Sequence, residues 1–167
     1  MDTATKGLSG QIAHDLGLEP GALEKVGTAL AGALADTYLL YVKTQNYHWN
    51  VTGPHFGELH MMFEQQYRNL ADAVDELAER LRAIGRFAPG SYAQFSQLSK
   101  IKEAPERVPP SMDMVRHLAD DHEHVVRRMR EVLETSDSVG DQESSDIMIA
   151  RMRYHAKQAW MLRSYLQ

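Results

Sequence analysis

The strongest periodic pattern in the chain lies in residues 54–84, PHFGELHMMFEQQYRNLADAVDELAERLRAI. Apolar side chains recur there in steps of three and four residues over about four heptads, the spacing of one face of an α-helix. We expect this face to pack into the core of the protein. The row consists of Phe56, Leu59, Phe63, Tyr67, Leu70, Val74, Leu77, Leu81 and Ile84.

A second set of side chains lies beside this apolar row, within an arc of about 100° on the same helix. The set consists of His60, Glu64, Asp75 and Glu79, and its members are symmetric about a single midpoint. Glu64 and Asp75 lie roughly 16 Å apart along the helix, too far to share a metal ion within one chain. If the helix packs antiparallel against a copy of itself, His60 and Glu64 face the partner's Asp75 and the partner's Glu79. The spacing therefore predicts two equivalent clusters in a two-fold dimer.

Imidazole and carboxylate groups together form a nitrogen–oxygen ligand set that suits iron(II), and also manganese or zinc. His48 closes the preceding helix twelve residues before His60, and the turn at residues 52–54 can fold it back toward the same cluster. Trp49, beside His48, is a candidate oxidisable neighbour. Acid pairs at i,i+4 are also common on solvated helix surfaces, so spacing alone leaves both a metal site and an ordinary surface open.

The remainder of the chain predicts three more long helices, at about residues 21–48, 111–134 and 142–165. The connector between the second and third contains several prolines, and Tyr92–Leu98 is expected to form a short helix within it. In the last helix the expected buried row is Ile147, Ala150, Tyr154, Met161 and Leu162. The pattern is typical of an all-α, ferritin-like four-helix bundle with a long crossover. We expect a single domain over residues 1–167, with residues 1–20 as a tail or short segment and residues 21–167 as the bundle.

The composition excludes several classes of protein. The chain has no cysteine, which excludes disulfides and thiolate metal sites. Its net charge of −5 argues against non-specific binding of nucleic acid by the body of the protein. There is neither a recognisable signal peptide nor a run of about 18 apolar residues, so we expect a cytoplasmic protein.

The run YHWNVTG at residues 47–53, followed by Phe56, His60, Glu64 and the run DELAER at residues 75–80, resembles the Dps family of mini-ferritins. The likeness covers nearly the whole chain. It implies a ferroxidase that assembles into a hollow homododecamer. Such a protein oxidises iron(II), preferentially with hydrogen peroxide but also with oxygen, and stores the ferric mineral, which protects against oxidative damage.

The resemblance also implies roles for individual residues. His48, His60 and Glu64 are expected to bind iron from one subunit, and Asp75 and Glu79 from its two-fold mate. Two further residues, Asp141 and Asp146, are similar in placement to the acids that line the family's three-fold pores. The family usually has Asp where this chain has Glu64, and the extra methylene can shift the metal position while keeping the carboxylate chemistry.

Two other functions fit the sequence less well. A structural nucleoid protein that coats DNA needs clustered cations, but residues 1–20 contain a single cation, Lys6, against three acids, and residues 161–167 contain only Arg163. We therefore expect no DNA binding through the tails. An in-bundle di-iron oxidase typically carries Glu-x-x-His motifs, and the sequence has none.

The remaining histidines give weaker signals. His122 lies on an apolar row and is expected to be a hydrogen-bonded core histidine, whereas His124 points about 160° away and is expected to face solvent. His55, beside the turn, is expected at the surface. His155 suggests no role.

Overall fold

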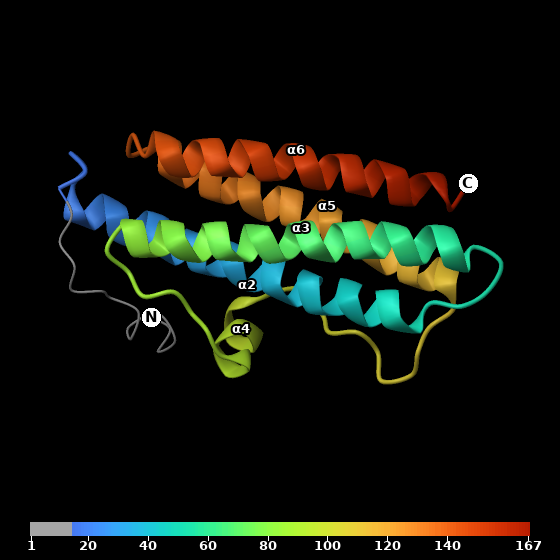
Figure 1. The fold of residues 1–167 in the computed structure, drawn as a ribbon. Coiled ribbons are helices and arrows are strands. Elements are labelled where there is room, and N and C mark those ends of the chain that lie inside the picture. The colour runs from blue at the N-terminus through green and yellow to red at the C-terminus, as the bar shows by residue number, and fades with distance from the viewer. Residues whose placement is uncertain (1–14) are drawn as a thin grey trace.

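The computed structural model describes residues 15–167, which form helices joined by turns and one long crossover (Figure 1). The helices are α2 (Pro20–Asn50), α3 (Phe56–Ala83), α4 (Tyr92–Leu98), α5 (Ser111–Asp137) and α6 (Gln142–Ser164). The described part of the chain contains no β-strand. This confirms the predicted all-α bundle with a short helix in its crossover. The expectations for residues 1–14 of the tail, including Lys6, lie outside the described residues.

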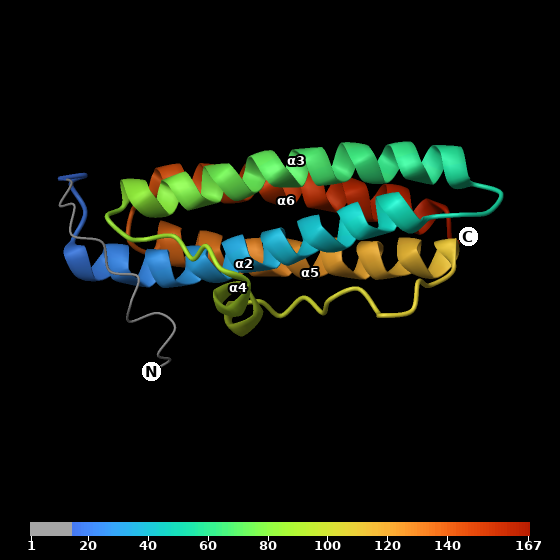
Figure 2. The ribbon, with the colours of Figure 1, turned by 60° about the horizontal axis from the view of Figure 1, so that its bottom comes forward.

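The four long helices lie alongside one another, with α2 antiparallel to α3 and α5 antiparallel to α6 (Figures 1 and 2). A short turn joins the helices within each pair. The crossover runs back along the outside of the bundle and carries α4 against α2 (Figure 2). None of the described helices is long and apolar enough to span a membrane.

Local sequence signals set the ends of these helices. Pro20 occupies the first turn of α2, where its missing N–H costs nothing. Gly85 follows α3 with φ +83°, a left-handed conformation that glycine adopts without strain. At the start of α4, Ser91 and Gln94 cap each other's backbone N–H groups in a capping box. Because each signal is local, the predicted bounds of the long helices are within three residues of the observed ones.

The core is built mainly from apolar side chains of α2, α3 and α5, and the row expected for α3 largely lies inside it. Burial of one leucine side chain contributes about 1.5–3 kcal/mol, so these side chains are the main source of stability. Phe56 is an exception, because it is 48% exposed and lies at the first residue of α3. The prediction that Phe56 belongs to the core row was therefore wrong.

The buried row of α6 also differs from the prediction. Ala150 is exposed, and the face turned inward contains Ser144, Ser145, Met148, Arg151, His155, Ala159 and Leu162. This row carries a buried arginine and a buried histidine, so a search for apolar side chains cannot find it. The expected row lay partly on the wrong side of the helix.

A buried carboxylate ties the crossover to the bundle. Asp36 on α2 accepts hydrogen bonds from the Lys100 backbone N–H (2.7 Å), the Ser99 hydroxyl (2.8 Å) and Arg128 Nε (2.9 Å). Burial alone would raise the pKa of Asp36, but these hydrogen bonds outweigh it and hold the pKa below its usual value. His124 Nε2 lies 3.1 Å from the same carboxylate, so His124 is partly buried and paired rather than facing solvent as expected.

A second polar cluster lies between α5 and α6. His122 and His155 are fully buried, and their Nδ1 atoms are 2.8 Å apart. Arg151 reaches His155 Nε2 at 3.3 Å and donates to Asn69 Oδ1 at 2.9 Å. The expectation of a hydrogen-bonded core histidine at position 122 is confirmed, whereas the buried position of His155 was not foreseen.

Candidate metal centre

The turn between α2 and α3 brings His48 and His60 together. Gly53 has φ +105°, a conformation that L side chains rarely adopt, and it reverses the chain between the two helices. Val51 is buried and anchors the turn to the core. As a result the two imidazole rings stack with their centroids 3.8 Å apart and their planes at 23°.

The two histidines also fix each other's tautomer. His48 Nδ1 lies 2.8 Å from the carbonyl oxygen of His60, and His60 Nδ1 lies 2.9 Å from the carbonyl oxygen of His48. A carbonyl oxygen can only accept, so each Nδ1 must carry the proton and donate. In the neutral imidazoles each Nε2 then has a free lone pair. Hydrogen bonds of this kind, from one ring nitrogen to a protein carbonyl, orient histidines so that the other nitrogen can bind a metal ion.

Aromatic rings surround this histidine pair. The Phe56 ring centroid lies 5.1 Å from that of His60, and the Tyr67 centroid lies 5.2 Å from that of His48. His48 is buried, and His60 is partly buried. Exposed Phe56 thus packs beside His60 at the edge of the candidate site rather than in the core.

Glu64 lies one turn beyond His60 on α3 and is held by an arginine. Its Oε1 accepts a hydrogen bond from Arg68 Nη2 at 2.5 Å, and the Glu64 side chain is 34% exposed. This i,i+4 pair directs the carboxylate along the helix surface. The structure therefore brings His48 and His60 into contact, while the Glu64 carboxylate lies one turn further along α3 and is paired with Arg68.

Asp75 and Glu79 lie further along α3, and both are exposed. They line an open acidic groove of about 740 Å³ between α3 and the start of α6. Asp146 lies in the same groove. Among residues 15–167, no three histidine, aspartate or glutamate side chains of one chain converge closely enough to hold a metal ion. Within one chain, His60 with Glu64 and Asp75 with Glu79 thus form two separate groups on α3.

The two residues predicted to line a pore differ sharply in their surroundings. Asp141 is fully buried at the start of α6, where it accepts hydrogen bonds from the Ser144 backbone N–H (3.0 Å) and the Ser144 hydroxyl (2.7 Å). Arg80 Nη2 forms an ion pair with the same carboxylate at 2.5 Å. Asp146 is exposed. Asp141 therefore acts as a helix cap and ion-pair partner, while the pore role of both residues stays a prediction.

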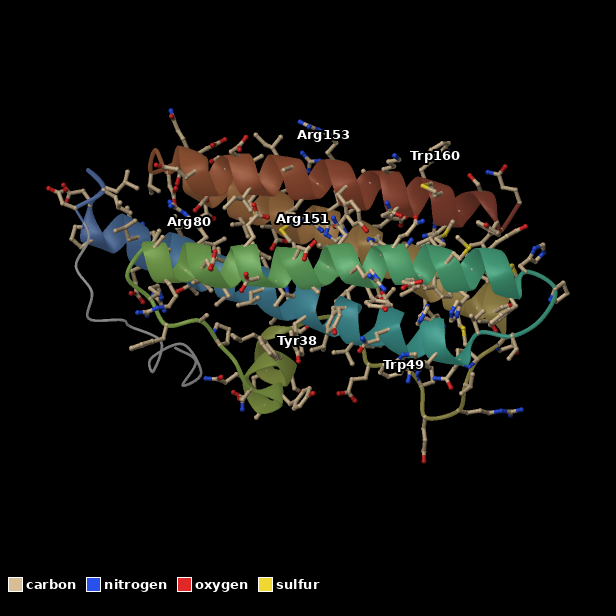
Figure 3. The ribbon with its side chains drawn as sticks, viewed as in Figure 1. Tyr38, Trp49, Arg80, Arg151, Arg153 and Trp160 are labelled. Carbon is tan, nitrogen blue, oxygen red and sulfur yellow. The ribbon has the colours of Figure 1, made fainter. Side chains whose placement is uncertain are left out.

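Trp49 projects from the C-terminal end of α2 and is 66% exposed (Figure 3). Within residues 15–167 its indole makes no ring contact with another aromatic side chain. Its role as a redox neighbour stays a prediction. The phenol ring in contact with His48 is instead that of Tyr67, which the sequence pattern had placed in the core row.

The comparisons with known proteins agree with this architecture. A family model described as a ferritin-like domain matches residues 28–167. A low-temperature-induced protein of Nostoc is 40% identical over 154 residues, which are 92% of this chain and 86% of the relative. DNA protection during starvation protein 2 of Bacillus anthracis is 33% identical over 133 residues, covering 80% of this chain and 90% of the relative.

Solved structures give the same result. The Dps protein of Vibrio cholerae O1, described as a member of a broad superfamily of ferritin-like diiron-carboxylate proteins, matches with a TM-score of 0.87 and 31% identity. That match covers 95% of this chain and 100% of the other. Dps from Staphylococcus aureus matches with a TM-score of 0.82 and 33% identity over 85% of this chain and 95% of the other.

Proposed function

This chain belongs to the Dps family of ferritin-like proteins, and from that premise we propose that it oxidises iron(II) at sites shared between two subunits. Hydrogen peroxide is the preferred oxidant in this proposal. The ferric product is stored as a mineral inside a hollow homododecamer. Consumption of both iron(II) and peroxide accounts for protection of DNA, the property in the relatives' name, without contact between protein and DNA.

The observation that carries this proposal is the paired arrangement of His48 and His60. Their Nδ1 atoms are occupied by backbone carbonyls, which leaves two Nε2 lone pairs at one place. Glu64 adds a carboxylate one turn away. Two nitrogens and a carboxylate form an incomplete ligand set for iron(II), so further oxygen ligands must come from elsewhere.

The missing ligands are supplied by Asp75 and Glu79 of a second subunit. Both side chains are exposed, and both lie on α3 symmetrically to Glu64 and His60. Ala71, between the two half-sites, is exposed and small, which allows a second α3 to approach closely. An isologous contact between two α3 helices builds two complete sites at once.

The chemistry at such a site needs two iron(II) ions for each peroxide. Each iron(II) gives one electron, and the two electrons with two protons reduce one hydrogen peroxide to two water molecules. The carboxylates stabilise the iron(III) product because they offset its added positive charge. The backbone hydrogen bonds of His48 and His60 hold the imidazoles in place during this change.

Mixing two inactive variants tests whether the site is shared. His60→Ala removes a ligand from one half-site and Asp75→Ala from the other, so each variant alone loses fast iron oxidation. In a mixed dimer one site carries both defects and the other site carries none. With random pairing in a 1:1 mixture, about a quarter of all sites are intact. We expect stopped-flow oxidation of iron(II) by peroxide to recover to about that fraction.

The control for this experiment is Glu76→Gln, an exposed acid on α3 next to Asp75 but outside the proposed ligand set. It should oxidise iron at the wild-type rate. No recovery in shells shown by mass to contain both variants would place the site within one chain. Wild-type rates in both single variants would refute the ligand assignment.

A second experiment tests the proposed pore. Asp146→Asn removes an exposed charge and should slow iron uptake at low salt, with the difference reduced at high salt because the steering is electrostatic. Asp141→Asn instead weakens a helix cap and leaves Arg80 without its buried partner. We expect Asp141→Asn to lower the free energy of unfolding by about 1–3 kcal/mol. Uptake unaffected by Asp146→Asn at low salt would remove this residue from the path of iron.

A further inference from the structure

Three methionine side chains line one groove between α3 and α6. The groove has a volume of about 340 Å³ and lies where the start of α3 runs beside the end of α6 (Figure 1). We call it the methionine groove. It is separate from the acidic groove, which lies at the opposite ends of the same two helices. The lining includes Met61, Met62 and Met161 together with Glu58, Lys157 and Gln158.

Side-chain hydrogen bonds bridge α3 and α6, and the two helices approach each other less closely than the other neighbouring long helices do. Gln66 Nε2 donates to Gln158 Oε1 at 3.1 Å, and Arg151 donates to Asn69 Oδ1 at 2.9 Å. Because the two backbones stay apart, long side chains can enter the space between them. The methionine groove lies beside the first of these bridges, since Gln158 belongs to its lining.

Two of the three methionines have no role in the core. Met114, Met129 and Met148 are buried and belong to the core, which is the ordinary use of this residue. Met61 is 60% exposed in the single chain, and neither it nor Met161 is among the described side chains that form the core or pack against it. Core packing therefore does not account for these two thioethers.

Helix spacing directs the methionines of the two helices toward the same space. On α6, Met161 follows Gln158 by three residues and Lys157 by four, so all three lie on one face (Figure 3 labels the residue before it, Trp160). On α3, Met61 and Met62 follow Glu58 by three and four residues in the same way. Met161 therefore reaches the groove from α6, while Met61 and Met62 reach it from α3.

The two grooves between α3 and α6 offer different ligands to a cation. Six carboxylates and one arginine line the acidic groove, so its field attracts divalent ions. The methionine groove has one carboxylate and one ammonium group, whose charges offset each other, and its Glu58 carboxylate already lies 3.6 Å from His55 Nδ1. A cation in the methionine groove must therefore be held by sulfur. Thioethers are soft ligands that select copper(I), whereas imidazole and carboxylate groups suit iron(II) and other divalent ions.

We propose that the methionine groove binds one copper(I) ion through the thioether sulfur atoms of Met61, Met62 and Met161. Bound in this way, copper(I) is withheld from peroxide, with which the free ion gives copper(II), hydroxide and a hydroxyl radical. This site is distinct from the histidine pair, and the inference does not rest on the proposed ferroxidase function.

The copper site does not depend on exposure of the methionines to solvent. Met61 lies about 100° around α3 from His60, at the edge of the proposed contact between two α3 helices. A second subunit that covers Met61 leaves its sulfur in the ligand set, because thioethers hold an ion without any contact with water. The assembled protein is therefore the form in which binding is tested.

The experiment is an anaerobic calorimetric titration of the assembled full-length protein with copper(I) kept in solution by acetonitrile. Excess zinc(II) is present to occupy nitrogen–oxygen sites. The wild-type protein should bind one copper(I) ion per chain. Met61→Leu and Met161→Leu should each weaken binding by at least about tenfold, since loss of an outer partner alone costs that much at metal sites. Leucine has nearly the volume of methionine, so both variants should fold and assemble.

Copper K-edge X-ray absorption identifies the ligand atoms, and a matched variant controls for the substitution itself. We expect sulfur scatterers around copper in the wild type and fewer of them in Met61→Leu and Met161→Leu. Met152→Leu makes the same change on α6 at a side chain that packs against the core outside the groove. It should bind copper(I) like the wild type. Copper held by the histidine pair would instead show nitrogen scatterers and would be lost in His60→Ala.

The outcomes separate this inference from the proposed function. Met161→Leu should oxidise iron(II) at the wild-type rate while it binds copper(I) weakly. Absence of copper binding in the wild type, wild-type affinity in Met61→Leu or Met161→Leu, or nitrogen scatterers alone would each overturn the copper site. Slow iron oxidation in a wild-type protein that binds copper(I) through sulfur would refute the ferroxidase proposal and leave the copper site standing.

Discussion

Among residues 15–167, two histidine pairs are in ring contact, and they are built in opposite ways. In the first pair, His48 and His60 bind each other's backbone carbonyls through Nδ1 and leave both Nε2 atoms free. In the second pair, His122 and His155 bind each other directly through Nδ1, deep between α5 and α6. The first pair keeps two ring nitrogens without a hydrogen-bond partner among the described residues, and the second pair turns its nitrogens toward each other.

The hydrogen bonds of the second pair determine its protons. Arg151 can only donate, so His155 Nε2 accepts and His155 Nδ1 must carry the proton. His155 Nδ1 then donates to His122 Nδ1, which leaves the His122 proton on Nε2, an atom without a partner among the described residues. Burial, and then the nearby Arg151, lowers the pKa of His122 to about 3. Burial, His122 and Arg151 also lower the pKa of His155 well below its usual value.

The difference shows that the histidine's partner decides its chemistry more than its helix position does. A carbonyl partner orients the ring and leaves one nitrogen for metal. A second histidine and an arginine use up that nitrogen and disfavour any added positive charge. The first pair has the arrangement that the proposed function assigns to iron binding, and the second pair links α5 and α6, although both lie on regular helices of the same bundle.

The largest expected effect comes from removing one histidine of each pair. His155→Ala leaves a cavity and removes a hydrogen-bond partner from buried His122 and from buried Arg151. We therefore expect a loss of about 3–5 kcal/mol in the free energy of unfolding. His60→Ala should change that quantity by less than about 1 kcal/mol, because His60 is only partly buried. Urea denaturation at matched protein concentration measures both changes.

In a metal titration the order of the two variants should reverse, with the larger effect in His60→Ala. His60→Ala should lose anaerobic binding of cobalt(II), and His155→Ala, at a temperature where it is folded, should keep it. Either of two results would contradict the different roles of the two pairs: loss of cobalt binding in fully assembled His155→Ala, or a lower stability of His60→Ala than of His155→Ala.

The pH dependence of stability gives a smaller effect and belongs to the second pair. In the unfolded chain His122 titrates near 6.5, whereas in the folded chain its pKa is about 3. Between these values the unfolded state binds more protons, so the stability is complete above pH 6.5 and is lost as the pH falls. We expect the slope from each buried histidine to approach about 1.4 kcal/mol per pH unit.

Urea unfolding from pH 7.5 to pH 5 in wild type and His122→Phe measures this slope. The variant should be less sensitive to acid than the wild type, since one buried titrating group is gone. His55→Gln, which removes an exposed histidine, should keep the wild-type slope. Equal slopes in all three proteins would contradict the prediction, because they would mean that His122 does not contribute to the pH dependence of the stability.

The two pairs also show what sequence alone could predict. His60 lies beside a clear apolar row and at a fixed distance from His48 across a Gly53 turn, so simple spacing was enough to bring the two together. His155 lies on a buried face that also carries Arg151, and no apolar pattern marks that face. The architecture was predictable because three of the four core rows are apolar.

Other features depend on contacts between distant segments and were not predictable. His124 is drawn from the surface to Asp36, which lies 88 residues earlier in the chain. Tyr38 of α2 and Tyr92 of α4 come into ring contact only after the crossover packs against the bundle. Nothing in the sequence distinguishes Asp141 from a solvated acid. In the structure it is buried and forms an ion pair with Arg80 of another helix.

The smallest expected effect concerns the arginine attached to each pair. Arg151 is buried against His155, whereas Arg68 is 70% exposed and holds Glu64 by a surface ion pair. Metal binding by Glu64 must compete with this pair, so Arg68→Gln should tighten cobalt(II) binding by about two- to fivefold, with the gain reduced at high salt. The matched control is Arg153→Gln, since Arg153 lies on the outer side of α6 (Figure 3) and its loss changes the net charge equally. Equal gains in both variants would assign the effect to overall charge, whereas a gain confined to Arg68→Gln would show that Arg68 restrains a ligand in the way that Arg151 restrains His155.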